Sequence, residues 1–137
     1  MVSQSITYLG TLRCSAVHGP SGVHLVTDAP TDNHGRGESF SPTDLVVTAL
    51  ATCMVTTMGI RAQADGVSLD GTSVVAEKHM STDPPRRVAR IVIQIRMPGD
   101  IEISYREVLE RTARTCPVAQ SIHTAIDVAL SFRYGNA

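Results

Sequence analysis

The stretch LVVTALATCMVTTMGI, residues 45–60, decides the fold class. Apolar side chains occur on nearly every side of this segment when it is wound as a helix, so it has no face suited to water. The preceding SPTD at 41–44 predicts a helix start, with a capping serine, a proline at the first helical position and a carboxylate three residues after the cap. We therefore expect one helix from Ser41 to about Ala64, buried on several sides.

Upstream of this helix, the sequence predicts a β-hairpin over residues 5–28. Its strands are expected at 6–17 and 23–27, joined by HGPSG at 18–22, which is rich in turn-forming residues. Residues 28–41 are rich in Asp, Asn, Gly, Pro and Ser, and we expect a loop there, where functional side chains are often found.

Downstream, residues 67–79 and 87–97 predict a second hairpin. The second of these strands alternates apolar and polar residues with a period of two, which indicates one buried face; the apolar positions are Ile91, Ile93, Ile95 and Met97. Ser104 and Glu107 have the spacing of a capping box, and they predict a helix that ends near Arg114.

A short helix is expected to begin after Cys116-Pro117, and an alternating strand over 126–134 closes the chain. Strands and helices that cluster in this way predict an α+β fold, with antiparallel sheets from the hairpins, rather than a doubly wound sheet. The length of 137 residues fits a single domain over 1–137.

Composition narrows the function classes. The net charge of −1 gives no attraction for nucleic acid or an anionic membrane. The N-terminus lacks a signal peptide pattern and the apolar stretch is short for a membrane span, so we expect a cytoplasmic protein without a membrane partner. Three cysteines are an odd number for a disulfide framework, which leaves thiol redox chemistry or metal binding as their uses.

Cys116 is the cysteine with the clearest local signal. Because Pro117 suits the first helical position, Cys116 is expected at the N-cap. Unpaired backbone N–H groups and the helix dipole would then lower the pKa of its thiol. The alternative is a cysteine that only caps a helix.

Cys53 lies in the middle of the apolar helix, where a free cysteine is most often a small core residue. Burial would raise the pKa of its thiol, so a redox role requires a nearby Arg or Lys. Cys14 is expected in the core. The cysteine spacings contain no metal-binding motif and the five histidines are scattered, so we expect no metal and no other cofactor.

Taken together, SPTDL at 41–45, ATC at 51–53 and CPV at 116–118 before a final alternating strand resemble the OsmC/organic hydroperoxide resistance family. The resemblance covers nearly the whole chain. It implies an intertwined homodimer in which the long central helices are buried by both chains, with antiparallel sheets around them.

The resemblance also implies roles for single residues. In the peroxidases of the family, the helix cysteine attacks the substrate and the Cys-Pro cysteine resolves the product, which are Cys53 and Cys116 here. An arginine before the helix stabilises the thiolate, and it is best matched by Arg36, with Arg13 as a second candidate. A small organic hydroperoxide is then the substrate, and an external thiol is the reductant.

One position departs from the peroxidases. They carry a glutamate directly after the proline of the helix start, where this chain has Thr43. Asp44 follows one residue later with a capping role, so Glu38 is the candidate that would orient the arginine. This difference places the chain nearer the less characterised OsmC-like branch. The rival interpretation is a non-enzymatic dimer that binds a small apolar ligand.

Overall fold

The computed structural model describes residues 1–136, and the chain folds as two compact units, Met1–Val46 and the part from Val47 onward. Strands and helices are mixed in the order expected from the sequence, which confirms the α+β class. The elements are β1 (Gln4–Gly10), β2 (Arg13–His18), β3 (His24–Asp28), the short 3-10 helix Thr31–Asn33, α1 (Pro42–Ala64), β4 (Ser73–Met80), β5 (Val88–Met97), α2 (Ile103–Arg114), α3 (Pro117–Ser121) and β6 (Asp127–Tyr134).

The first unit contains an antiparallel sheet in the order β1-β2-β3. The expected single strand over 6–17 is wrong, because the chain reverses between β1 and β2. Gly10, Thr11 and Leu12 all have positive φ angles there. Thr and Leu rarely adopt this conformation, so their sequence gives little sign of the turn.

The start of α1 agrees with the prediction in detail. Ser41 precedes the helix, and its hydroxyl accepts a hydrogen bond from the backbone N–H of Asp44 at 3.0 Å. The Asp44 carboxylate in turn accepts one from the backbone N–H of Ser41 at 2.8 Å. This reciprocal capping box satisfies two backbone donors at a helix end.

The second unit contains a sheet in the order β4-β5-β6. β4 and β5 form the expected antiparallel hairpin, although β4 begins at Ser73 rather than at Val67. β6 pairs with β5 in parallel, so this sheet is mixed and not purely antiparallel as expected. The two helices between β5 and β6 explain the difference, because a crossover connection returns the chain in the same direction.

The start of α2 corrects another prediction. The helix begins at Ile103 with Glu102 at the N-cap, and no side chain caps it. Ser104 therefore lies inside the first turn, and the capping box expected from Ser104 and Glu107 is wrong. The C-terminal end at Arg114 agrees with the prediction.

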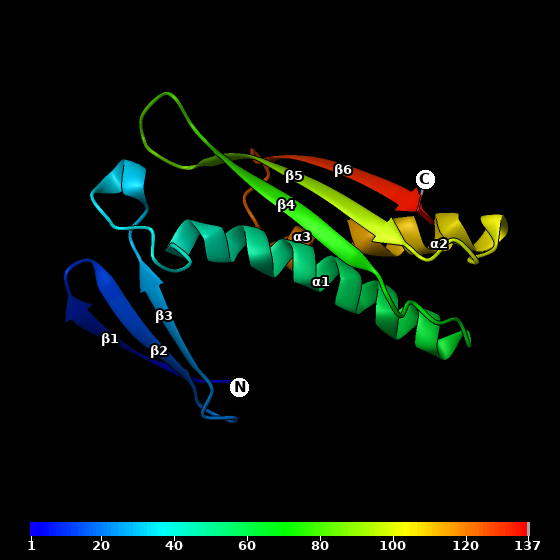
Figure 1. Ribbon diagram of the computed structural model, residues 1–137, viewed down its shortest axis with the longest axis horizontal. Helices are drawn as coiled ribbons and strands as arrows, with labels where there is room; N and C mark the ends of the chain where they lie inside the picture. The colour runs from blue at the N-terminus through cyan, green and yellow to red at the C-terminus, as the bar shows by residue number, and fades with distance from the viewer. Residues whose placement is uncertain (137) are drawn as a thin grey trace. The chain divides into compact units, whose positions relative to one another are not determined.

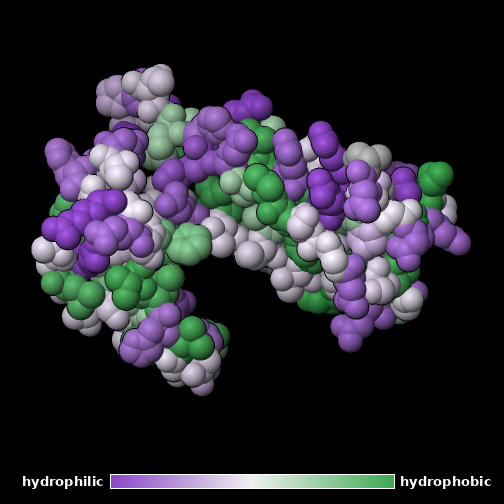
Figure 2. All heavy atoms as spheres, viewed as in Figure 1, coloured by the Kyte–Doolittle hydropathy of each residue, from purple (hydrophilic) through white to green (hydrophobic). Residues whose placement is uncertain are grey.

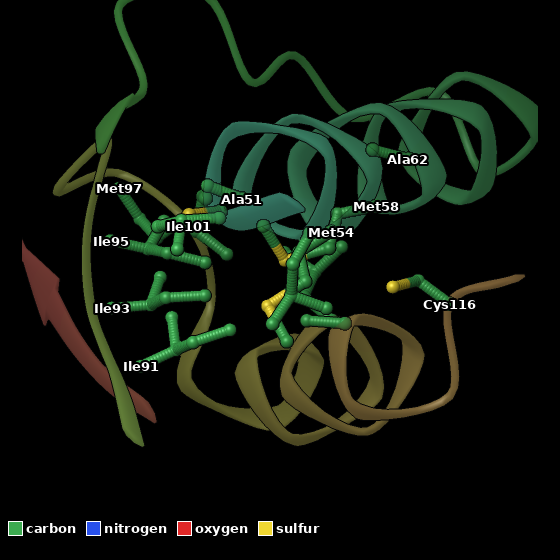
Figure 3. Packing of buried hydrophobic residues seen from close by; sticks show 14 residues of the cluster. Ala51, Met54, Met58, Ala62, Ile91, Ile93, Ile95, Met97, Ile101 and Cys116 are labelled. Carbon is green, nitrogen blue, oxygen red and sulfur yellow. The ribbon is translucent and has the colours of Figure 1, made fainter. Parts of the chain in front are cut away.

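The core of the second unit lies between α1, β5 and α2 (Figure 3). The strands form one layer, and the helices lie on one side of it (Figure 1). The four apolar positions of the alternating strand are at most 1% exposed, as expected. On α1 the buried positions are Val47, Leu50, Ala51, Met54, Met58 and Ala62.

Within the single chain, α1 is buried on one face, whereas we expected burial on several sides. Ala49, Thr52, Thr56 and Ile60 are exposed, and Ile60 reaches 66%. By length and composition α1 could also cross a membrane, but the core helix of a soluble protein meets the same criterion. Some of the apolar residues of α1 are buried in the core of the second unit.

The first unit has a sheet but no apolar core of its own. Every buried hydrophobic side chain in residues 1–136 belongs to the second unit. Apolar surface is visible over the N-terminal strands in Figure 2. The large exposed hydrophobic residues of strands, turns and loop in this unit are Ile6, Tyr8, Leu9, Leu12, Val23, Val26 and Phe40.

Candidate active site: a thiol pair in the second unit

Cys53 lies in the middle of α1 and is half-buried. One helical turn later, the hydroxyl oxygen of Thr57 lies 3.8 Å from the Cys53 sulfur. Residues four apart share a face of a helix, so α1 itself sets this contact. Cys53 packs at the border of the core, with its sulfur available to groups of α3.

Cys116 is placed by the break between α2 and α3. It is the N-cap of α3, with Pro117 at the first helical position, as the sequence predicted. Its sulfur accepts a hydrogen bond from the backbone N–H of Ala119 at 3.4 Å. Its side chain is fully buried and points into the core cluster (Figure 3).

The structure brings the two thiols into contact. Cys53 and Cys116 are both free cysteines, and their side chains lie close enough for each thiol to shift the pKa of the other. A disulfide between them would therefore need only local movement of the two side chains. The two cysteines are far apart in the sequence, and the packing of α3 beside α1 brings them close together.

The pKa of the Cys53 thiol lies below its ordinary value. Burial acts to raise it, as expected from the sequence. Three hydrogen bonds outweigh burial, from the Val118 backbone N–H, the Cys116 thiol and the Thr57 hydroxyl. Hydrogen bonds to the charged form of a group stabilise that form. Burial therefore acts in the expected direction, but the pKa is lowered overall, and no Arg or Lys is among the causes.

The pKa of the Cys116 thiol shifts in the opposite direction. Burial raises it above its ordinary value, and the hydrogen bond and charge of Cys53 raise it further. The Ala119 N–H lowers it, but by less. The sequence predicted a lowered pKa from the N-cap position alone, and that prediction fails because Cys116 is completely buried. In the pair, Cys53 is therefore the thiol that ionises more readily, and Cys116 is the one that holds its proton more tightly.

Arg13, Arg36 and Glu38 belong to the first unit, where they lie close to one another. The guanidinium of Arg13 contacts the Glu38 carboxylate at 2.8 Å and the Asp28 carboxylate at 3.3 Å. Arg36 lies 3.8 Å from Glu38, and its side chain is 79% exposed. Arg13 is only 29% exposed. Glu38 therefore contacts both candidate arginines and holds Arg13 more closely.

Asp28 is a functional candidate that the sequence analysis missed. It ends β3 opposite Arg13 in the sheet register and is 1% exposed. The backbone N–H of Glu38 holds its pKa below the ordinary value, with Arg13 adding to the effect against burial. Its other oxygen, Oδ1, has no hydrogen-bond partner among the described residues. Asp28 could be found only from the register of β2 and β3, which pairs it with Arg13. The predicted strands had boundaries but no register.

Thr43, at the position of the family glutamate, lies beside the helix cap. Its hydroxyl is 3.2 Å from the hydroxyl of Ser41. Residues 1–136 contain no group of three or more His, Cys, Asp or Glu side chains arranged to hold a metal ion.

Comparison with known proteins shows which family the chain belongs to. A family model described as OsmC-like protein matches residues 35–131. A crystal structure from Psychrobacter arcticus, of a protein named for osmotic stress induction and a detoxification response, is 42% identical. The match has a TM-score of 0.91 and covers 97% of this chain and 96% of that one.

More distant structures share the fold. An organic hydroperoxide resistance protein OsmC from Legionella pneumophila is 18% identical, with a TM-score of 0.77 and coverage of 97% and 96% of the two chains. An OsmC-like protein from Mycoplasma pneumoniae is 12% identical, with a TM-score of 0.81 and coverage of 99% and 98%. No sequence among curated proteins matches the chain.

The opposite pKa shifts predict which thiol reacts first with an alkylating reagent. At neutral pH, iodoacetamide should modify Cys53 faster than Cys116, because only thiolates react and Cys53 has the lowered pKa. Peptide mapping by mass spectrometry at short times measures both rates. In urea the two rates should converge, and faster labelling of Cys116 in the folded protein would contradict the assignment.

Proposed function

This chain belongs to the family of OsmC-like proteins, and we propose that it is a thiol-dependent peroxidase that reduces organic hydroperoxides. The single observation that carries the proposal is the contact between two free thiols whose pKa values shift in opposite directions. A peroxidase of this kind needs one thiolate that attacks and a second thiol that resolves the product, and the opposite shifts support Cys53 and Cys116 in these two roles.

The proposed reaction proceeds in two steps on these sulfurs. The Cys53 thiolate attacks the distal oxygen of the hydroperoxide, the O–O bond breaks, and the alcohol leaves after taking a proton. Cys53 becomes a sulfenic acid. The Cys116 sulfur then attacks the Cys53 sulfur, water leaves, and a disulfide forms. An external thiol reductant supplies two electrons and two protons to restore both thiols.

The surroundings of the pair support an organic substrate. Cys53 packs against the hydrophobic cluster of the second unit, together with Val55 and Val118. Apolar walls favour a substrate with an alkyl or aryl group over hydrogen peroxide.

Arg13 is the better candidate for the arginine that assists the reaction. A guanidinium can stabilise a thiolate and the developing negative charge on the leaving oxygen only if its position is fixed. Arg13 is half-buried and contacts two carboxylates, Asp28 and Glu38, whereas Arg36 is exposed and has a longer contact with one. We therefore place Arg13 ahead of Arg36, with Glu38 and Asp28 as the carboxylates that orient it.

The proposal includes a homodimer. Residues paired across β-strands share a face, so Ile6, Ala16 and Leu25 form one apolar row across the first sheet. Tyr8 and Cys14 lie on the same face. A small sheet without a buried apolar face is not stable by itself in water, so it requires a further covering surface. A second copy of the chain, with its own exposed side of α1, is the partner that the family resemblance implies.

The cellular setting follows from the chemistry. A free thiol pair that cycles through a disulfide needs a reducing compartment with a thiol reductant. We therefore propose a cytoplasmic protein without nucleic acid, membrane or cofactor partners.

A hydroperoxide assay tests the proposed function directly. With one equivalent of cumene hydroperoxide, peptide mapping should find an intramolecular Cys53–Cys116 disulfide, and a dithiol reductant should support repeated turnover. Cys116→Ser should stop at a Cys53 sulfenic acid, which dimedone traps. Cys14→Ser serves as the control and should retain turnover. An unoxidised pair after this treatment would favour the ligand-binding interpretation.

The two arginines can be compared with matched substitutions. Arg13→Ala should slow oxidation of Cys53 by cumene hydroperoxide on the order of a hundredfold, because positioning losses have this size. Arg36→Ala should change the rate little. Arg13→Lys should restore the rate poorly, since an ammonium lacks the planar fork of donors. Stopped-flow measurement of Cys53 oxidation gives these rates, and a larger loss in Arg36→Ala would reverse the assignment.

The dimer is tested by light scattering. The chain should have twice its mass of 14.7 kDa at micromolar concentration. Ile6→Glu should weaken association, because it places a charge in the apolar row of the first sheet. Thr7→Glu changes the neighbouring residue on the opposite face and should leave the dimer intact. A stable monomer of the unmodified chain would rule out the proposed assembly.

A further inference from the structure

The contact between Thr57 and Cys53 stands apart from the other hydroxyl contacts of the helices. A Thr or Ser inside a helix usually donates to the carbonyl oxygen three or four residues earlier. The hydroxyls of Thr52, Thr112 and Ser121 do so, at 2.7 to 2.8 Å from the oxygens of Thr48, Val108 and Pro117. For Thr57, the residue four positions earlier is Cys53, and its hydroxyl lies 3.8 Å from the Cys53 sulfur.

The protonation state of Cys53 fixes the direction of this hydrogen bond. A thiolate has no proton and can only accept, whereas a threonine hydroxyl can donate. In the thiolate state the Thr57 hydroxyl therefore donates to the sulfur. In the thiol state the same pair gains much less, because hydrogen bonds to charged groups are about twice as strong as neutral ones. The contact consequently favours the charged form of Cys53.

The helix makes this donor permanent. Thr57 is one turn from Cys53 on the same rigid element and half-buried, so the hydroxyl stays near the sulfur without any loop closing. The backbone N–H of Val118 is a second donor, supplied by the first turn of α3. Among the described residues, the titratable side chain that shifts the pKa of Cys53 is Cys116, the N-cap of α3, and it lowers that pKa.

We propose that Thr57 is an activating residue, whose hydroxyl stabilises the Cys53 thiolate in the resting protein. The inference rests on the proposed function, since a stabilised thiolate matters for a reacting cysteine. It goes further, because it assigns activation of Cys53 to a residue of the same helix, in addition to any arginine. Thr57 contacts the reacting sulfur but has no bond to make or break.

Thr57→Val tests the proposal with almost no change in side-chain volume. Loss of the hydroxyl should raise the pKa of Cys53 by about one unit, which lowers the thiolate fraction about tenfold at pH values below the pKa. The pH profile of Cys53 alkylation by iodoacetamide, followed by peptide mass spectrometry, measures this shift. At high pH, where Cys53 is fully ionised, the rates of the variant and the unmodified protein should agree.

Three companion variants separate the hydroxyl from packing. Thr57→Ser retains the donor and should keep the profile of the unmodified protein. Thr57→Ala should shift the profile as Thr57→Val does, which secures the test if the valine variant folds poorly. Thr56→Val makes the same change at the neighbouring exposed position of α1 and should have no effect.

Each contrary outcome overturns the proposal. An unchanged profile in both Thr57→Val and Thr57→Ala would show that the hydroxyl does not stabilise the thiolate. A shift in Thr57→Ser or Thr56→Val would assign the effect to packing or to the helix in general, and equal slowing at every pH would assign it to access. Because alkylation uses no peroxide, a shifted profile in a protein that fails to reduce hydroperoxides would reject the proposed function and retain the role of Thr57.

Discussion

The packing of one face of α1 against β5 is the contact on which the thiol chemistry of this protein depends. Leu50, Met54 and Met58 on the helix face the alternating isoleucines of the strand, and these side chains are almost completely removed from water. Burial of this size is the main favourable contribution to folding. It fixes the rotation of α1 about its axis, and that rotation turns Cys53 toward the border of the core and leaves Thr52 and Thr56 at the surface. The second thiol, Cys116, is placed at the start of α3 by the break between α2 and α3 at Cys116-Pro117.

The pKa values of the two cysteines shift in opposite directions because burial raises each pKa, while hydrogen-bond donors lower it by different amounts. At the N-cap, the backbone N–H groups of Ala119 and Val118 lower the pKa of Cys116, but they are insufficient against full burial. Cys53 is less buried and receives three donors, one of which is Cys116 itself. A thiol that donates to a neighbouring thiolate becomes harder to deprotonate, so the two shifts are parts of one interaction. Local sequence could not reveal it, because the N-cap signal of Cys116 was visible and the burial was not.

The parts of the fold that sequence predicted well are those with one strong, local cause. The cap at Ser41 and Asp44 sets the start of α1, and the period of two in Ile91 to Met97 sets the buried face of β5. The failures have causes outside the local pattern. Thr11 and Leu12 adopt positive φ angles in a turn, although residues of these types rarely do so. The β6 strand pairs with β5 in parallel because the chain crosses over through α2 and α3. The family resemblance supplied both cysteines, while Asp28 required the register of β2 against β3, which places it opposite Arg13.

Thr43 leaves the chain without the carboxylate that orients the arginine in the peroxidases that it resembles, and two features of this structure bear on that loss. Asp28 and Glu38 contact Arg13 together, and Asp28 is buried with a charge that its neighbours stabilise, so a fixed guanidinium does not require a glutamate at position 43. Separately, the lowered pKa of Cys53 already has sources within the second unit, from Thr57 and from the turn that begins α3. In the proposed reaction, an arginine would then be needed mainly at the leaving oxygen, where negative charge develops only during the reaction. Thiolate formation and transition-state stabilisation would then be divided between different residues, so the substitution at position 43 can be tolerated as long as each group of residues remains in place.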